Sequence, residues 1–569
     1  MRSRRTSAHP TFPSSRGMTV EPQRGILSLP IDEFIHIARF LNTRGLARLA
    51  ASCRAVWDGI PLSLGPQVAG RVAGESEVAG GSVVAEVLLQ LVLSRGGAVP
   101  QQLPPTWGGW VQYLLRRLGR YDDQRGRLVA AGGGGPHSAI VDKAGAVRIC
   151  GSERYCPGLL GGAAGGYEVE TDWYQVLASD EEDPASHIEM RTLTRVAGLI
   201  GVRVVAIAAD TLGCYTLALS ATGEVFSWGG GSAADSGALG QGDKLPRGVP
   251  TRVEALSGKG VCGLSACYST SLAWTVAGRL FTWGQFFNFA PPSPPDEDNP
   301  NRVGVNKRDD AIVGQHLSPT LIQELEGKPV RCAAAGHLHI VAVLQNGQLY
   351  SWGPSGFSHG HGQTRGNVIV PTQVAALAHV QICDVVACDD SLALSESGEV
   401  YSWGLNCWQC LGHPPDEGEL PEKSSPADIP RRVEALAGLR VRSLAITVRT
   451  AFAVTDGGHI YSWGWETGCS ATVSRRRSQL EGMPDVNILP RRAEALQRFR
   501  MVRVVSSTKH ALGVSVDGRV FSWGHMAMAL DGFTPGVALG LDIQQLIPFN
   551  TGSLQPPTQI RHVRVRVGL

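Results

Sequence analysis

The stretch Gly398-Glu399-Val400-Tyr401-Ser402-Trp403-Gly404 decides the fold, because the same pattern recurs along the whole second part of the chain. The pattern is Gly, polar, aliphatic, aromatic, Ser or Thr, Trp, Gly. It returns at Gly223–Gly229 (GEVFSWG), Gly278–Gly284 (GRLFTWG), Gly347–Gly353 (GQLYSWG), Gly458–Gly464 (GHIYSWG) and Gly518–Gly524 (GRVFSWG), with a worn copy at Gly145–Gly151 (GAVRICG). These seven copies indicate a fold built from similar units placed side by side.

Each copy predicts a β-hairpin. A short run rich in Val, Phe, Tyr and Trp between two glycines is typical of a strand. The first Gly suits a tight turn in which φ is positive. A preceding strand is visible at Thr216–Leu219 and at Ser391–Leu394, and a further apolar run lies upstream, as at Val204–Ala209. Most copies end, after a variable stretch, in a Pro-containing tail such as Pro250–Leu256 or Pro430–Leu436.

Each unit therefore has about four short strands and a period of roughly 50–80 residues. One such sheet cannot bury both of its faces, whereas a radial arrangement covers them. We predict a mainly β protein in which residues 126–569 form a seven-bladed β-propeller. The alternating segment Val563–Val567 is expected to open an eighth copy, pair with the first blade and close the ring. An open solenoid is the alternative, but nothing in the sequence looks like a polar capping repeat.

The Trp-Gly hairpins, the Pro-Thr tails and a partial Gly-x-x-His-Ser element at Gly135–Ser138 resemble the regulator-of-chromosome-condensation repeat family. A shifted form of that element stands at Gly336-His337. Members of the family look like seven-bladed propellers, which agrees with the fold predicted from the repeats. The family's Asn-x-x-Gly-Gln-Leu-Gly element is visible only at Gly237–Gly242 and Asn406–Gly412, and inserts replace it elsewhere.

Composition sets limits on the class of protein. The 569 residues leave room for one large domain and one or two small ones. The net charge of +2 argues against a nucleic-acid partner. The 12 cysteines show no framework spacing, so we expect them to be reduced and buried in a cytoplasmic and/or nuclear protein. The longest apolar stretch, residues 83–93, contains Glu86 and Gln90 and is too short to span a membrane. The N-terminus lacks the apolar region of a signal peptide.

The chain before the propeller divides into three parts. Residues 1–24 are rich in Arg, Ser, Pro and Thr and predict a disordered basic tail. Residues 25–60 predict two or three short helices, with Ser28 placed to cap the first and Pro30 to open its first turn. Residues 61–125 predict a helical bridge that packs this small domain onto the propeller.

Residues 25–60 resemble an F-box. The match consists of Leu-Pro near the start, apolar residues as far as Leu41, and Ala-x-Cys-Arg before Trp57, which falls one residue later than the commoner spacing. An F-box docks on a Skp-type adaptor and links a substrate receptor to a cullin–RING ubiquitin ligase. The alternative is a plain helical cap packed on the propeller. The resemblance implies adaptor contacts at Leu29, Pro30, Phe34, Ile37, Leu41 and Leu46.

The variable stretches lie between the Trp-Gly strand and the Pro-Thr tail, so several of them should emerge at one rim. Long loops on a rigid scaffold commonly carry binding surfaces. The alternative is that each loop is a solvated insertion. The charged loop residues predicted to bind a partner are Asp180, Glu181, Glu182, Asp296, Glu297, Asp298, Arg475, Arg476 and Arg477.

The sequence offers no catalytic constellation. Cys407 and Cys410 form a lone pair without zinc partners at the required spacing. The histidines His137, His339 and His510 recur near one loop level, where buried, hydrogen-bonded rings are favoured over catalytic bases. The recurring Trp residues are expected in the core. No phosphate-binding loop, dinucleotide fingerprint or nucleophile elbow is present in the sequence. We therefore predict no catalytic residue, no metal site and no cofactor.

These features favour a non-enzymatic substrate-recognition subunit of an SCF-type (Skp–cullin–F-box) ubiquitin ligase. The F-box would bind the Skp-type adaptor of the cullin–RING ligase, and the propeller would bind an unidentified protein substrate. One alternative is a guanine-nucleotide exchange factor, which would stabilise the nucleotide-free state of a small GTPase through the long insert of the third blade. Another is a propeller scaffold without a role in ubiquitination.

Overall fold

The computed structural model describes residues 129–132, 137–153, 156, 158–162, 189–210, 214–230, 232–287, 313–353, 357–362, 368–414, 425–465, 486–507, 510–525 and 554–564. The predicted basic tail (1–24), F-box-like domain (25–60) and helical bridge (61–125) lie outside the described residues. The described residues belong to the predicted propeller.

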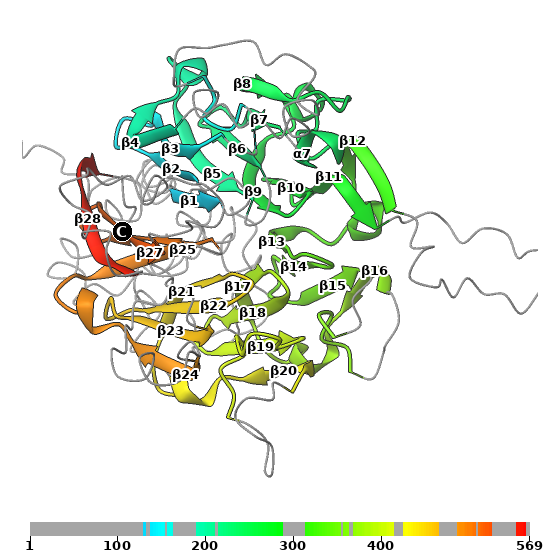
Figure 1. Ribbon diagram of the computed structural model, residues 1–569. Coiled ribbons are helices and arrows are strands. Elements are labelled where there is room, and N and C mark those ends of the chain that lie inside the picture. The colour runs from blue at the N-terminus through cyan, green and yellow to red at the C-terminus, as the bar shows by residue number, and fades with distance from the viewer. Residues whose placement is uncertain are drawn as a thin grey trace, which may run out of the picture.

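Seven four-stranded antiparallel sheets form the blades of a ring (Figure 1). In every blade the strands are paired in chain order, and the first strand is the innermost. This confirms the predicted seven-bladed β-propeller.

The first blade contains β1 (Val129–Gly132), β2 (His137–Val141), β3 (Val147–Ser152) and β4 (Glu189–Arg195), and the second contains β5 (Val204–Ala209), β6 (Tyr215–Ser220), β7 (Val225–Gly229) and β8 (Arg247–Arg252). The third contains β9 (Val261–Cys267), β10 (Thr270–Thr275), β11 (Leu280–Phe287) and β12 (Val313–Leu321), and the fourth contains β13 (Val330–Ala335), β14 (Ile340–Leu344), β15 (Leu349–Gly353) and β16 (Val368–Gln373).

The remaining blades follow the same plan. The fifth contains β17 (Ile382–Ala387), β18 (Asp390–Ser395), β19 (Val400–Gly404) and β20 (Ala427–Arg432), the sixth contains β21 (Val441–Ile446), β22 (Thr450–Thr455), β23 (Ile460–Trp465) and β24 (Val486–Arg492), and the seventh contains β25 (Met501–Ser506), β26 (His510–Ser515), β27 (Arg519–His525) and β28 (Leu554–Arg564). Short 3-10 turns lead from six of the blades to the next: η4 (Ala197–Leu199), η5 (Glu254–Leu256), η6 (Gln323–Leu325), η7 (Ala375–Leu377), η8 (Glu434–Leu436) and η9 (Glu494–Leu496). One helical turn, α7 (Ser232–Asp235), follows β7.

The first glycine of each repeat makes the hairpin possible. Gly398 has φ of +91° and Gly145, in the worn copy, has φ of +86°. At both positions a side chain would meet neighbouring backbone or side-chain atoms of the connection into the next blade. Only glycine adopts this conformation without strain, so the prediction of a tight turn with positive φ is confirmed.

The repeated tryptophans fill the core and join neighbouring blades. Trp228, Trp283, Trp352, Trp403, Trp463 and Trp523 are all at most 1% exposed. The indole Nε1–H of Trp403 donates to the carbonyl oxygen of Ser358 in the preceding blade (2.9 Å), and Trp463 donates in the same way to Cys410 (2.7 Å). A glycine after each acceptor lies against the ring, as Gly360 does on Trp403. Gly161 and Gly360 occupy this place in blades where the sequence had indicated only inserts.

A second set of contacts joins the blades through their second strands and closes the ring. His137 Nε2 lies 3.0 Å from Thr216 Oγ1, and His339 Nε2 lies 2.6 Å from Ser391 Oγ. The same contact joins the last blade to the first, because His510 Nε2 lies 2.8 Å from Ser138 Oγ. The prediction that these histidines are buried and hydrogen-bonded is confirmed.

The predicted mechanism of closure is wrong. Val563 and Arg564 belong to β28, the fourth strand of the seventh blade, in which Arg564 pairs with Arg519 on β27. They do not pair with the first blade. Instead, β1 packs against β25 and β26 without a shared strand ladder. The two described residues of the alternating pattern do lie in a strand, but the outermost strand of a blade and an innermost strand look alike in sequence. Residues 565–567 lie outside the described residues.

The first strands line a central channel (Figure 1). Their small residues, such as Ala333, Ala334 and Ala335 on β13, allow seven strands to approach the axis. The channel holds a cavity of about 110 Å³, and its only charged lining residues in the described part of the chain are Asp384 and Arg503.

Candidate protein-binding face

The long connections of the repeats leave from one face of the ring. In an antiparallel four-stranded sheet, the first-to-second turn and the third-to-fourth connection lie at the same end. The predicted partner-binding residues lie in three such connections, β3 to β4, β11 to β12 and β23 to β24, and all of them fall outside the described residues. The same is true of the predicted adaptor-binding residues Leu29, Pro30, Phe34, Ile37, Leu41 and Leu46. The described part of this face includes the first-to-second turns of the third to sixth blades, most of the connection from β7 to β8, and parts of other connections.

Three of these turns are linked by side chains. The ring of Tyr268, in the third blade, lies 4.2 Å from the ring of His337 in the fourth. His337 Nδ1 lies 3.1 Å from Asp389 Oδ1 in the fifth blade, and its backbone N–H donates to the carbonyl oxygen of Cys388 (2.9 Å). Tyr268 is 42% exposed and has φ of +56°, which is uncommon for a residue with a bulky side chain. The turn thus holds an aromatic ring out toward solvent.

The same face continues into the fifth and sixth blades. Trp408 follows β19 and is half-buried, and the guanidinium of Arg449, on the first-to-second turn of the sixth blade, lies 4.4 Å from the centre of its ring. Cys407, next to Trp408, is an exposed free thiol. The side chain of Asn406 fixes this loop, because its Oδ1 accepts from the N–H of Leu411 (3.3 Å) and its Nδ2 donates to Ser425 (3.0 Å). We call Tyr268, His337, Asp389, Trp408 and Arg449 the aromatic path.

Buried ionisable groups lie beneath the aromatic path. Asp390 is 2% exposed, and its burial raises the pKa of the carboxyl to about 7 although the N–H of Asn406 donates to its Oδ1 (2.8 Å). Burial, together with the neighbouring His359 and His337, lowers the pKa of His339 to about 3. Burial, together with the neighbouring His361, also lowers the pKa of His359 to about 4. The imidazoles of His339 and His359 are therefore uncharged at neutral pH, whereas the carboxyl of Asp390 loses its proton only near pH 7.

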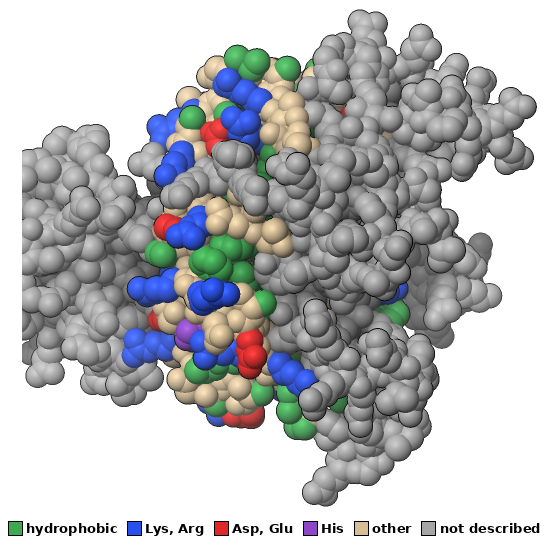
Figure 2. All heavy atoms as spheres, turned by 60° about the vertical axis from the view of Figure 1, so that its left-hand side comes forward, with side chains coloured by type: hydrophobic (Ala, Val, Ile, Leu, Met, Phe, Trp, Pro, Cys, Tyr) green, Lys and Arg blue, Asp and Glu red, His purple; other side chains and the backbone are tan. Residues whose placement is uncertain are grey.

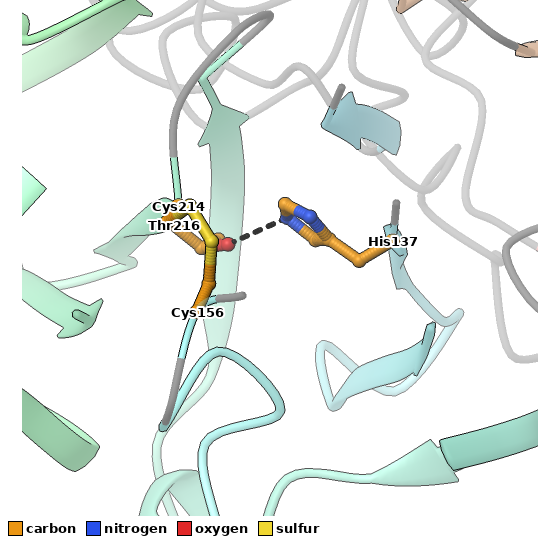
Figure 3. The surroundings of a disulfide bond; sticks show 4 residues. All are labelled: His137, Cys156, Cys214 and Thr216. Atoms are coloured by element: carbon orange, nitrogen blue, oxygen red, sulfur yellow. Dashed lines mark hydrogen bonds between the residues drawn. A yellow bond between two sulfur atoms is a disulfide. The ribbon is translucent and has the colours of Figure 1, made fainter. Parts of the chain in front are cut away.

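A disulfide joins the first and second blades near the same face (Figure 3). It links Cys156, after β3, to Cys214, before β6, with Cα atoms 5.3 Å apart. The hydrogen bond between His137 and Thr216 joins the same two blades beside it. The prediction that the cysteines are reduced is wrong for this pair, which has no recognisable spacing because it joins two separate repeats. The eight other described cysteines form no disulfide, and all of them except Cys262 and Cys407 are buried.

The described residues contain no group of three or more His, Cys, Asp or Glu side chains arranged to hold a metal ion. Within the same part of the chain, no helix has the length and apolar character of a membrane-spanning segment. Neither finding adds a metal-binding or membrane-spanning group to the described part of this face. The aromatic path offers aromatic rings, one carboxylate and one guanidinium, which are groups that bind other molecules.

Comparisons with known proteins identify the repeat. The regulator of chromosome condensation (RCC1) repeat matches residues 222–274 and 397–454. The chain is 34% identical over 283 residues to the E3 ubiquitin-protein ligase HERC2 of Homo sapiens, which covers 48% of this chain but only 5% of HERC2. It is 28% identical over 335 residues to the ultraviolet-B receptor UVR8 of Arabidopsis thaliana, covering 58% of this chain and 67% of UVR8.

Among solved structures, Prp20p of Saccharomyces cerevisiae superimposes with a TM-score of 0.51 at 20% identity, over 66% of this chain and 81% of Prp20p. At this identity the likeness concerns the fold alone. It agrees with the repeat found in the sequence and with the seven sheets of the ring. The chain thus carries RCC1 repeats, and these repeats build a seven-bladed β-propeller.

Proposed function

We propose that this chain is a non-catalytic substrate-recognition subunit of an SCF-type ubiquitin ligase. In this proposal residues 25–60 dock a Skp-type adaptor of a cullin–RING ligase, and the propeller binds a protein substrate on the face from which the long connections leave. The observation that carries the substrate-binding half is the aromatic path, which extends over four neighbouring blades. The adaptor-binding half rests on the F-box resemblance of the sequence.

The composition of the aromatic path suits a protein partner. Tyr, Trp and Arg are the residues that most often dominate the energy of protein interfaces. Here Tyr268 is supported by His337, and Trp408 is supported by Arg449 and by the loop that Asn406 holds. Because the ring fixes these side chains before binding, little conformational entropy is lost on forming a complex.

One relative also favours a connection with ubiquitination. HERC2 is by name a ubiquitin-protein ligase, and it is 34% identical over 283 residues to this chain, which carries RCC1 repeats. That activity belongs to HERC2, of which this chain spans only a small part. HERC2 therefore supports the proposal as an example of a ubiquitin ligase that resembles part of this chain.

Two sets of variants of the full chain test the two halves separately. Leu29→Ala with Pro30→Ala should abolish binding of a purified Skp-type adaptor and leave the captured substrates unchanged. Tyr268→Ala with Trp408→Ala should have the opposite effect, as measured by affinity purification and mass spectrometry. Ile369→Ala with Val370→Ala, which changes two exposed residues on the outer strand β16, is the matched control and should change neither. Adaptor binding that survives the first pair would contradict the ligase assignment.

Nucleotide exchange is the second candidate. Prp20p, which shares the fold of this chain, binds Gsp1p and histones. Full-length protein that fails to bind the adaptor but accelerates the release of labelled GDP from a small GTPase would replace the ligase proposal with exchange activity. Capture of neither an adaptor nor a GTPase would leave a scaffold without a role in ubiquitination.

A further inference from the structure

The outer edge of the ring carries a repeated arginine, which two blades neutralise in the same way. In the second blade, Arg252 contacts Glu224 (3.0 Å) and Glu254 (2.7 Å). In the fifth blade, Arg432 contacts Glu399 (2.9 Å) and Glu434 (2.7 Å). One glutamate precedes the third strand and the other begins the 3-10 turn. Each of these triads has one positive and two negative groups.

The sixth blade breaks this pattern. His459 stands where Glu224 and Glu399 stand in the other two blades, and its Nδ1 lies 3.0 Å from Nη2 of Arg492. Partial burial and the charge of Arg492 lower the pKa of His459, so the imidazole does not add a charge at neutral pH. Among the described residues Arg492 forms no ion pair with a carboxylate, and its charge is available to a partner.

Three further arginines lie close by. Arg491 precedes Arg492 on β24, and Arg498 and Arg500 follow η9. All three side chains are exposed, and none forms an ion pair within the described part of the chain. Arg500 packs against Gly458, the residue before His459. Arg492 and Arg500 thus contact two consecutive residues, His459 and Gly458, and Arg491 and Arg498 lie next to them in the chain.

Local backbone geometry explains why arginine fits here. In the second and fifth blades the residue after the 3-10 turn is extended (ψ 132° at Ser257 and 138° at Ala437), and a glycine with positive φ must follow. In the sixth blade Gln497 stays in the right-handed helical region (φ −58°, ψ −23°). The residue after Gln497 therefore does not have to be glycine, and it is Arg498.

The surface extends onto the seventh blade. The guanidinium of Arg519 lies 5.5 Å from the ring centre of Phe499, and that ring lies 4.5 Å from the ring of Phe521. Arg519 itself is paired with Asp517 (2.6 Å), and Glu494 is exposed nearby on η9. We define Arg491, Arg492, Arg498, Arg500 and Arg519 as the sixth-blade basic surface. Figure 2 shows Lys and Arg side chains along this outer edge of the ring, with acidic side chains between some of them.

We propose that the sixth-blade basic surface binds an extended, acidic protein segment. Guanidinium groups match carboxylates in both charge and geometry. The proposal is independent of the proposed ligase function, because this surface is on the outer edge and not on the face that carries the aromatic path. A nucleic acid fits less well, since single strands are commonly held by bases stacked on open aromatic rings. The ring of Phe499 is half-buried between Phe521 and Arg519.

The test uses the full chain and a fluorescent oligoglutamate peptide, with anisotropy as the readout at low and at physiological salt. Replacing Arg491, Arg498 and Arg500 together by Gln should weaken binding at least about tenfold, because three unpaired charges are lost. His459→Glu should also weaken binding, because it supplies the carboxylate that the other two triads possess. Circular dichroism and the melting temperature show that each variant is folded.

The matched control is the triple variant Arg252→Gln, Lys259→Gln and Arg279→Gln, which removes as many exposed cations from the second and third blades. It should bind the peptide as the wild type does. Equal loss in the control and in the sixth-blade variant would show that binding is non-specific and would overturn the proposal. So would unchanged binding in the sixth-blade variant. A labelled oligothymidylate that binds more tightly than the peptide, through the same arginines, would assign the surface to nucleic acid instead.

Discussion

Asp390 is a carboxylic acid in a position where none of the other six blades has an acidic side chain. It begins β18, as His137 begins β2 and Thr450 begins β22. Burial is the main reason why its pKa is raised to about 7, with the charge of Asp389 as a smaller cause. In the folded protein the group therefore keeps its proton well above the pH at which an unfolded chain loses it, near 4.

The direction of the resulting pH dependence follows from proton linkage. Between about pH 4 and pH 7 the folded state binds this proton and the unfolded state does not. The free energy of unfolding therefore falls as the pH rises through this window, by about 1.4 kcal/mol per pH unit from this one group.

Asp390→Asn should remove this loss of stability. Asparagine is uncharged at every pH and keeps an oxygen that can accept from the N–H of Asn406. We expect the variant to be more stable than the wild type at pH 8 and about equally stable at pH 4. Urea unfolding at the two pH values measures the difference. A variant that is destabilised equally at both would show that the carboxyl is held by contacts other than those described.

Two of the tryptophans near the ends of the third strands allow the contribution of one hydrogen bond between blades to be measured. Trp403 donates to the carbonyl oxygen of Ser358 (2.9 Å), whereas Nε1 of Trp352 has no hydrogen-bond partner among the described residues. Both rings are at most 1% exposed. The two tryptophans are therefore about equally buried, but only the indole N–H of Trp403 donates a hydrogen bond.

We expect Trp403→Phe to cost about 1 kcal/mol more in the free energy of unfolding than Trp352→Phe, because only the first removes a buried hydrogen bond. Both variants lose part of the ring volume, so this loss largely cancels in the comparison. Chemical denaturation of the two variants and the wild type supplies the numbers. Equal costs would mean that the indole hydrogen bond of Trp403 adds nothing to the stability of the junction between blades.

How well the sequence predicted these elements depended on whether a feature repeats. The glycines with positive φ and the buried tryptophans recur at one place in each copy, so their roles could be predicted from the pattern. The partner of His339 could not, because Ser391 is 52 residues away in another blade. The aromatic path escaped prediction for the same reason. Its members Tyr268, His337 and Asp389 lie on turns of three different repeats and have no common motif.

Two errors also have local physical causes. Val563 and Arg564 do belong to a strand, as predicted, but alternation between Val and Arg does not distinguish an outer strand from an inner one. The disulfide between Cys156 and Cys214 joins positions 58 residues apart in two blades, and their sequence neighbours carry no sign of pairing.

In the closed ring, the contact between the first and last blades is of the same kind as the contact between two blades that are neighbours in sequence. Ser138 and His510 are 372 residues apart, yet their contact of 2.8 Å has the same form as the contact of 2.6 Å between Ser391 and His339, which are 52 residues apart. Both serines are fully buried. In a linear array each repeat is stabilised only by its neighbours, and a terminal repeat can separate without unfolding the rest. In a ring no repeat is terminal.

Ser138→Ala and Ser391→Ala should therefore lower the stability of the whole propeller by similar amounts, each by about 1–2 kcal/mol, because each removes a buried hydrogen bond to a histidine. Unfolding monitored by tryptophan fluorescence and by circular dichroism should remain a single transition in both variants. If instead Ser138→Ala left the main transition unchanged, or produced an early separate one while Ser391→Ala shifted the main transition, the first and last blades would be acting as free ends. The contact between His510 and Ser138 would then join the ends of an array without making it cooperative.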